Sequence, residues 1–304
     1  MDATKGFITV ATGKDRYYIL AHNLLLSYRY HNKSQVPFAI LCDRENEWTA
    51  DFDQVVIIDN PTRTLSDKIR ILDLAPFDET IFLDSDCLVY RNLEPMWDIF
   101  SEGPDVGVLG YTYPLESDKG WWDKKDLGAL QGKVDYKMTC QGGVYYIRKN
   151  GKVFPAFMET CRYIQQHYTE YKFRIFPYLP EDETIFSLAS CVHHYLPVRN
   201  WADIFAYYPV VRLIDHDILS GTLEFECTEF QAPRYKASFL LHFGTAYAAN
   251  RWAYKKDVFK LNKGPILLSN MLDYSMLRLE HTWGKIKKTV LRLLGIQYEL
   301  KIYA

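Results

Sequence analysis

The chain has 304 residues, enough for one large α/β domain, and its 48% hydrophobic and 24% charged residues are ordinary globular values. A formal net charge of -2 excludes a basic surface spread over the whole chain, so we expect no nucleic-acid partner. The six cysteines lie far apart without a Cys-x-x-Cys pair, and no apolar leader or membrane-spanning run is visible, which predicts a cytoplasmic protein with reduced, buried thiols.

Short β-rich runs alternate with helical patterns through the first hundred residues. The predicted strands cover residues 6–12, 37–42, 54–59, 80–90 and 106–111, and the predicted helices cover 17–28, 64–72 and 92–100. A strand, a short polar loop and a helix open a Rossmann-like unit, in which ligands gather beyond the carboxyl ends of the strands. We therefore expect an α/β fold around a parallel sheet.

The loop after the first strand is a candidate nucleotide contact. It lacks the G-x-G-x-x-G pattern, so a dinucleotide is not expected. Thr12 and Tyr17 are candidates for contacts with a nucleotide base or ribose. Ordinary roles at a loop and a helix start are equally open for both residues.

Two carboxylates, Asp84 and Asp86, stand at the centre of the apolar run 80–90. In an extended segment residues two apart project to the same side, so the two acids converge and Ser85 points away. Two like charges among apolar neighbours are costly to bury unless a cation neutralises them, and a divalent ion with bound phosphate oxygens does so. The open alternative is a strand end whose acids meet solvent, because Asp-x-Asp alone is weakly specific.

The apolar run 238–245 predicts a later strand that ends at His242, just before Gly244. With two carboxylates awaiting a metal, a neutral imidazole is a suitable third ligand, whereas a satisfied core histidine is the alternative. Lys68 falls on the predicted helix just upstream of the Asp84 strand. A lysine there can reach a phosphate as a point charge or simply remain solvated.

A glycine pair, Gly142 and Gly143, runs into a strand and marks close approach of the backbone to a ligand or to another segment. Gln141 can hold a sugar hydroxyl, although a bend without a ligand role is equally open. A helix beginning after Pro180 opens with three acids, as the helix dipole favours. The same turn is a natural place for an acid that faces a substrate, and we single out Asp182.

The remaining patterns are less informative. Residues 153–168 predict a core helix and 195–198 a short strand, whereas 202–229 are hard to assign. The irregular stretch 113–137 carries Trp121 and Trp122, which either stack on an acceptor sugar or plug the loop onto the body.

Taken in order, these residues resemble the family 8 glycosyltransferases, a retaining group with the GT-A fold, a single α/β domain around a mixed, largely parallel sheet. The resemblance covers most of residues 6–252. It rests on Lys68 as the upstream basic position, Asp84-Ser85-Asp86 as the Asp-x-Asp motif, Gln141-Gly142-Gly143 in place of Asn-Ala-Gly, Asp182-Glu183 in place of Asp-Gln, and His242 with Gly244 as part of the metal-binding pattern. The lysine of that last pattern is not kept, so its phosphate role would pass to Arg251.

The resemblance implies a metal-dependent glycosyltransferase that moves a hexosyl group from a nucleotide sugar, most simply a UDP-sugar, to a glycan or lipid-linked acceptor with retention. Such a reaction belongs to polysaccharide or lipopolysaccharide synthesis. Asp84, Asp86 and His242 would hold Mn²⁺ or Mg²⁺. Donor contacts would come from Thr12, Tyr17, Lys68, Asp84, Ser85, Gly142, Gly143, Gly244 and Arg251, with Asp182 and Gln141 acting at the donor sugar.

Three alternatives remain open. An inverting GT-A enzyme would use Asp182 as general base for the acceptor hydroxyl. A sugar-1-phosphate nucleotidyltransferase would need a glycine-rich, arginine-bearing phosphate cradle, which the first loop lacks. The alternative from another class is a catalytically inactive glycan-binding or membrane-surface module.

The catalytic domain is expected over residues 1–268, with a tail over 269–304. In the tail one helical face carries Trp283, Ile286, Val290, Leu293 and Leu294, and another carries Lys285, Lys288 and Arg292. A basic amphipathic helix of this kind can lie on an anionic membrane surface, on the cytoplasmic face. Docking on its own domain is an equally open interpretation.

Overall fold

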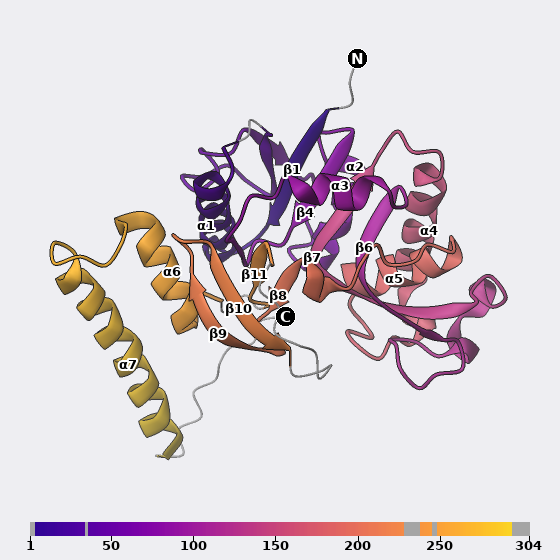
Figure 1. The fold of residues 1–304 in the computed structure, drawn as a ribbon. Helices are drawn as coiled ribbons and strands as arrows, with labels where there is room; N and C mark the ends of the chain where they lie inside the picture. Colours follow the sequence, from indigo (N-terminus) through magenta and orange to yellow (C-terminus); the bar gives the residue numbers. More distant parts are fainter. Residues whose placement is uncertain (1–3, 34–35, 228–237, 245–247, 294–304) are drawn as a thin grey trace.

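A computed structural model describes residues 4–33, 36–227, 238–244 and 248–293 (Figure 1). Its centre is a six-stranded sheet with the strand order β3-β2-β1-β4-β7-β6. The strands are β1 (Lys5–Ala11), β2 (Phe38–Cys42), β3 (Gln54–Ile57), β4 (Glu79–Leu83), β6 (Val106–Pro114) and β7 (Tyr136–Arg148). Strands β1 to β4 run parallel, and β7 is antiparallel to both of its neighbours. The predicted α/β fold with a mixed, largely parallel sheet is confirmed.

Helices connect the strands and follow the last one along the chain. They are α1 (Asp15–His31), α2 (Ile71–Leu74), α3 (Pro95–Ser101), α4 (Phe154–Gln166), α5 (Asp182–Val192), α6 (Trp252–Lys263) and α7 (Met271–Leu293). The helix predicted over 64–72 is instead a 3-10 segment, η1 (Leu65–Arg70), that runs into the short α2. Further 3-10 segments are η2 (Lys124–Asp126), η3 (Gly128–Leu130), η4 (Tyr168–Tyr171), η5 (Trp201–Asp203) and η6 (Ala248–Asn250).

The central strands are buried on both faces, which is why their sequences are almost continuously apolar. Along β4, Phe82 packs with the core under α4 and α5, whereas Ile81 and Leu83 pack with the core under α1 and α3. All six cysteines are buried and free, as predicted. Trp122 is fully buried against Phe173, so this tryptophan plugs its loop onto the body and does not stack on a sugar.

A second, three-stranded sheet lies beside the end of the central sheet, in the order β5 (Cys87–Val89), β11 (Leu240–His242) and β8 (Phe205–Tyr207). An antiparallel pair, β9 (Val211–Asp217) and β10 (Thr222–Cys227), follows β8 along the chain. The predicted strand over 195–198 is wrong, because only Arg199 forms an isolated bridge, to Leu109.

Helix α7 extends away from the body on one side of the molecule (Figure 1). Its inner face meets α6, where the Trp252 ring lies 5.8 Å from Tyr274 and 5.3 Å from His281. The opposite face exposes a stripe of large apolar side chains: Leu272, Met276, Leu279, Trp283 and Ile286. The predicted contributions of Lys288, Val290, Arg292 and Leu293 concern side chains outside the described set, and residue 294 lies beyond the described chain. No helix among the described residues combines the length and apolar character needed to cross a bilayer.

Candidate active site

Asp84 and Asp86 lie in a tight turn between β4 and β5. The prediction of one extended strand through both acids is therefore wrong. The N–H of Cys87 donates to the carbonyl of Asp84 at 3.0 Å, and the N–H of Ser85 donates to the Asp84 side chain at 2.8 Å. The turn places both carboxylates at the carboxyl end of β4. This turn, and not the alternation of side chains along a strand, brings them together. Ser85 is buried in this turn.

His242 ends β11 opposite Cys87, which brings its ring beside the turn. Its Nε2 lies 3.1 Å from Asp86 Oδ1 and 3.6 Å from Asp84 Oδ2. The N–H of Phe243 donates to the carbonyl of Asp86 at 3.2 Å, which fixes the end of β11 against the turn. The three predicted metal-binding side chains are thus brought together, although His242 follows the two acids by more than 150 residues in the sequence.

This donor set fits a divalent ion. Two donors about 2.1 Å from one ion and at right angles stand about 3 Å apart, close to the spacing found here. Among the described residues, neither ring nitrogen of His242 has a well-formed hydrogen bond, although the ring is buried. The Cys87 sulfur also lies within 4.8 Å of the Asp86 and His242 donors, but burial raises the pKa of its thiol well above the ordinary value. A protonated thiol is a poor ligand, which leaves the carboxylates and the imidazole.

Charge compensation without a metal comes from Lys68 and His242. Lys68 Nζ lies 2.6 Å from Asp84 Oδ2 and 3.7 Å from Asp182 Oδ2. Burial alone would lower the pKa of Lys68, but Asp182 and Asp84 raise it well above its usual value. Burial likewise opposes charge on His242, yet Asp86 and Asp84 raise the pKa of its ring to about 10. Lys68 is therefore an inward-facing charged group and not a solvated helix lysine.

Asp182 begins α5 and points into the protein. Its Oδ2 accepts a 2.7 Å hydrogen bond from the Tyr145 hydroxyl, and its side chain is only 2% exposed. Burial raises the pKa of this carboxyl against the opposing effect of Lys68. The Asp182 side chain is therefore buried between Lys68 and Tyr145.

Glu183, the next residue, is only partly buried. Its Oε1 accepts a 2.6 Å hydrogen bond from the N–H of Gly142. Glu181 caps the same helix by accepting from the N–H of Thr184 at 2.7 Å and of Glu183 at 3.1 Å. Burial first, and then the charges of Glu181 and Asp182, raise the pKa of Glu183 to about 8.

The glycine pair allows these groups to approach β7. A Cβ at Gly143 would stand 2.7 Å from Nδ1 of His242, and one at Gly142 would stand 2.8 Å from Asp182 Oδ2 and 2.9 Å from Glu183 Oε1. The predicted close approach of the backbone is therefore confirmed, with the partners being His242 and the start of α5. Gln141 stands beside this pair on β7 and is partly buried.

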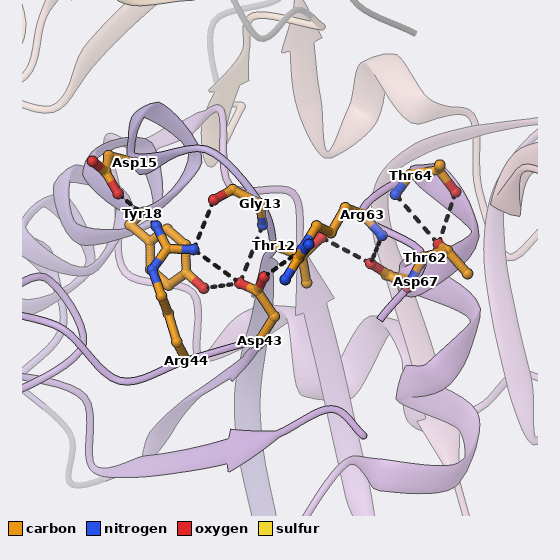
Figure 2. A network of polar contacts seen from close by, with 10 residues as sticks. All are labelled: Thr12, Gly13, Asp15, Tyr18, Asp43, Arg44, Thr62, Arg63, Thr64 and Asp67. Atoms are coloured by element: carbon orange, nitrogen blue, oxygen red, sulfur yellow. Dashed lines mark hydrogen bonds and ion pairs between the residues drawn. The ribbon is translucent and has the colours of Figure 1, made fainter. Parts of the chain in front are cut away.

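A polar network joins the carboxyl ends of β1 and β2 to the segment that carries Lys68 (Figure 2). Thr12 donates from Oγ1 to Asp67 Oδ2 at 2.8 Å, and Asp67 also accepts from the N–H groups of Thr62 and Arg63. Asp43 accepts from the N–H of Gly13 at 3.1 Å and from Arg63 Nε at 2.9 Å. Thr12 therefore links the end of β1 to the Asp67 side chain, and it remains a candidate contact for a nucleotide.

The other predicted donor contacts are Tyr17, Gly244 and Arg251. Tyr17 accepts from Arg16 at 3.1 Å on the first turn of α1. Gly244 has a φ of 60°, and a Cβ there would meet the Tyr207 ring at 2.3 Å, so only glycine fits after β11. Arg251 is exposed, with its guanidinium 5.5 Å from the centre of the Tyr208 ring, so the structure does not bring it into contact with the carboxylates.

Comparison with solved structures identifies the architecture. The galactosyltransferase LgtC, solved with donor and acceptor sugar analogues, superimposes with a TM-score of 0.51 at 12% identity, over 88% of this chain and 99% of LgtC. The chain has the GT-A fold. Weaker likenesses include an active-site mutant of LgtC (TM-score 0.49, 14% identity, 88% of this chain and 99% of that one) and mouse xyloside xylosyltransferase 1 (0.42, 12%, 63% and 83%). No family model and no curated protein matches the sequence.

The predicted resemblance to family 8 is therefore borne out at the level of the GT-A fold. Sequence reasoning did not single out Tyr207, whose ring lies 5.2 Å from that of His242, because it belongs to the unassigned stretch 202–229. The alternation of apolar and acidic residues over 223–227 is a sequence signal for the strand β10 in this stretch.

Proposed function

We propose that this chain is a metal-dependent glycosyltransferase that moves a hexosyl group from a nucleotide sugar, a UDP-sugar in the simplest case, to a glycan or lipid-linked acceptor with retention. The observation that carries the proposal is the meeting of Asp84, Asp86 and His242 at the carboxyl end of β4 within a GT-A fold. Ligands of open α/β sheets bind at this edge.

Asp86 and His242, with Asp84 beside them, would hold Mn²⁺ or Mg²⁺. The ion would neutralise the charge that develops on the diphosphate leaving group. Lys68 lies 2.6 Å from Asp84, so it can exchange this carboxylate for a phosphate oxygen without a large movement. Thr12 and Asp67 hold the segment of Lys68 against the end of β1, where the nucleotide would lie.

Two features weigh against the competing interpretations. An inverting enzyme with Asp182 as general base needs this carboxylate at the acceptor hydroxyl, yet Asp182 is covered and bonded to Tyr145. An inactive binding module has no use for a buried histidine that stands 3.1 Å from Asp86 and 3.6 Å from Asp84. Six buried, free thiols suit a reducing compartment, so we place the reaction on the cytoplasmic side.

A lipid-linked acceptor would be reached at a membrane surface, and we propose that α7 provides the contact. Its exposed stripe includes Trp283, which is 67% exposed, and Ile286. Arg278, Lys285 and Lys287 are exposed on the same helix. Apolar side chains next to basic ones suit the interface of an anionic membrane.

A thermal-shift screen of UDP-, GDP- and CMP-sugars, each with and without Mn²⁺, tests the proposed donor. A donor that binds only the folded chain raises the unfolding temperature by mass action, and the rise should require Mn²⁺. Hydrolysis of the stabilising donor then separates an enzyme from a binding module. If no nucleotide sugar stabilises or is hydrolysed by the chain, the proposal is wrong.

A further inference from the structure

The exposed stripe of α7 follows a seven-residue repeat. Its members are separated alternately by four and by three residues: Leu272, Met276, Leu279, Trp283 and Ile286. In the sequence, Val290 and Leu293 continue this spacing. Such a repeat is typical of the seam along which two helices wind around each other, whereas a helix that lies on a bilayer needs only a broad apolar face. We propose that in solution a second copy of this chain covers the stripe, through an antiparallel coiled coil of two α7 helices.

The body of the protein contacts only the opposite face of α7. Among the α7 side chains that the structure describes, three are partly buried: Tyr274, Leu277 and His281. The Tyr274 ring lies 5.4 Å from that of Phe259, and the His281 ring lies 5.3 Å from that of Trp252. The members of the stripe are 46% to 75% exposed. Because α7 extends away from the body, this face is open along the helix to a partner (Figure 1).

Charges along the stripe favour the antiparallel direction. One edge carries Asp273, Glu280 and Lys287, and the other carries Ser275, Thr282 and Thr289, all of them exposed. A parallel pair brings opposite edges together and sets these charges against hydroxyl groups, whereas an antiparallel pair brings the two charged edges together. Asp273 then faces Lys287 of the second copy, at both ends of the contact. Asp273 also lies 3.9 Å from Lys263 of its own chain, but both side chains are more than half exposed, so this pair is weak. Solvent screens the two Glu280 side chains, which lie at the middle of the edge.

The size of Trp283 favours the same direction. In a parallel two-stranded coil each seam residue meets its own copy, so two indole rings would have to fit in one layer. In the antiparallel register that pairs Asp273 with Lys287, Trp283 instead meets Leu279 of the second copy. A large side chain beside a smaller one fills a layer more evenly than two indole rings do. The charges and the side-chain volumes of the stripe therefore agree on one arrangement.

Self-association and membrane contact would compete for the same side chains. The stripe cannot be covered by a second copy and by a bilayer at once, so an anionic membrane must replace the partner helix before α7 can bind it. The dimer would thus be the form in solution, and the form at the membrane would have its α7 helices separated. This inference goes beyond the proposed function, because the contact needs neither a sugar donor nor a metal ion.

Sedimentation equilibrium of the full chain, without donor, metal or lipid, tests the contact. The wild-type chain should have twice the mass of one chain. Leu279→Glu places two carboxylates in the middle of the seam and should give the mass of one chain, with the unfolding temperature of the body unchanged because Leu279 is 63% exposed. Met271→Glu makes the same kind of change at an exposed apolar residue outside the stripe and should remain dimeric. A monomeric wild-type chain or a dimeric Leu279→Glu overturns the proposal.

A charge exchange tests the direction of the two helices. Asp273→Lys replaces two ion pairs by two repulsions, and we expect the dissociation constant of the dimer to rise by about tenfold. Asp273→Lys combined with Lys287→Glu restores both pairs in the antiparallel arrangement and should return the dissociation constant to near the wild-type value. A double variant as weak as Asp273→Lys alone overturns the antiparallel coil.

Vesicles of phosphatidylserine and phosphatidylcholine test the competition. Chains labelled with two fluorophores at their N-termini should show energy transfer in solution and lose it when excess vesicles are added. A wild-type chain that is monomeric in solution but sediments with these vesicles has the membrane as the partner of the stripe, and this result overturns the proposal. Since none of these measurements uses a nucleotide sugar, a chain that dimerises but binds no donor contradicts the proposed function alone.

Discussion

Lys68 Nζ lies 2.6 Å from Oδ2 of Asp84, although the two residues belong to separate segments on either side of the turn before β4. Replacing Lys68 by methionine keeps most of the side-chain volume but leaves Asp84 and Asp182 without this cation. Removing one partner of a buried pair costs about 3–5 kcal/mol of unfolding free energy. Denaturant unfolding of Lys68→Met should show such a loss, whereas Lys68→Arg should keep most of the stability. Equal stability of Lys68→Met and wild type would contradict this assignment.

Metal dependence follows from the donor set. Asp86→Ala and His242→Ala should each abolish Mn²⁺-dependent donor hydrolysis while the folded structure remains, because each removes one donor and leaves the backbone of the turn and β11 in place. Hydrolysis rates with Mn²⁺, with EDTA and after Mn²⁺ is restored provide the measurement. Asp98→Ala, a change at an exposed acid on α3, is the control. Full activity in EDTA would exclude metal catalysis.

The stereochemical outcome is a third prediction. We expect an α-linked product from an α-linked nucleotide sugar, measured by the coupling of the anomeric proton in the NMR spectrum. Asp182→Asn should slow turnover strongly without moving the pH optimum, since Asp182 is covered by Tyr145 and does not exchange protons with substrate. A β-linked product would instead favour a single displacement with a carboxylate as general base.

Glu183 should make stability depend on pH. Its pKa is about 8 in the folded chain, raised by burial first and then by Glu181 and Asp182. An acid whose pKa is higher in the folded state contributes stability below its unfolded pKa of about 4.3, and this stability is lost as pH rises through the folded pKa. The glutamine of Glu183→Gln does not ionise. Its unfolding temperature relative to wild type should therefore rise between about pH 5 and about pH 8 in EDTA. A difference that stays constant over this range would contradict the assignment.

Membrane binding can be assigned to the exposed face of α7. Trp283→Glu combined with Ile286→Glu should abolish sedimentation with anionic liposomes, because two charges would enter the interface. Thr282→Glu combined with Thr289→Glu makes the same change of charge at exposed polar positions of the same helix and should weaken binding much less. A chain lacking residues 283–304 should also remain in the supernatant. Equal binding of all these chains would remove α7 as the contact.

Sequence patterns predicted the strands of the central sheet, because strands buried on both faces appear in the sequence as apolar runs between loops. They also identified the three candidate metal-binding residues, since charged or titratable groups inside such runs are uncommon. Asp84 and Asp86 nevertheless converge through a turn and not through strand alternation. Strand periodicity cannot indicate a turn that depends on the hydrogen bond from the Cys87 N–H to the Asp84 carbonyl.

The sequence alone could not show which of the neighbouring acids at the start of α5 is exposed. Asp182 and Glu183 differ in exposure because Tyr145 covers the first, and Tyr145 reaches Asp182 only through the pairing of β7 with β4. The roles of Thr12 and Asp67 depend on a similar long-range contact, 55 residues apart in the chain. Side-chain exposure at such positions is set by tertiary packing, which local patterns do not contain.

Strand β11 inserts between β5 and β8, and both of these precede it in the chain. A ribosome therefore completes every strand of the central sheet before it makes His242. Until that residue emerges, β5 and β8 lack the strand that joins them, and the turn with Asp84 and Asp86 has no histidine beside it. Assembly of the candidate metal site is thus a late event in biosynthesis, and a nascent chain that stalls before β11 would carry most of the fold without the third candidate metal ligand.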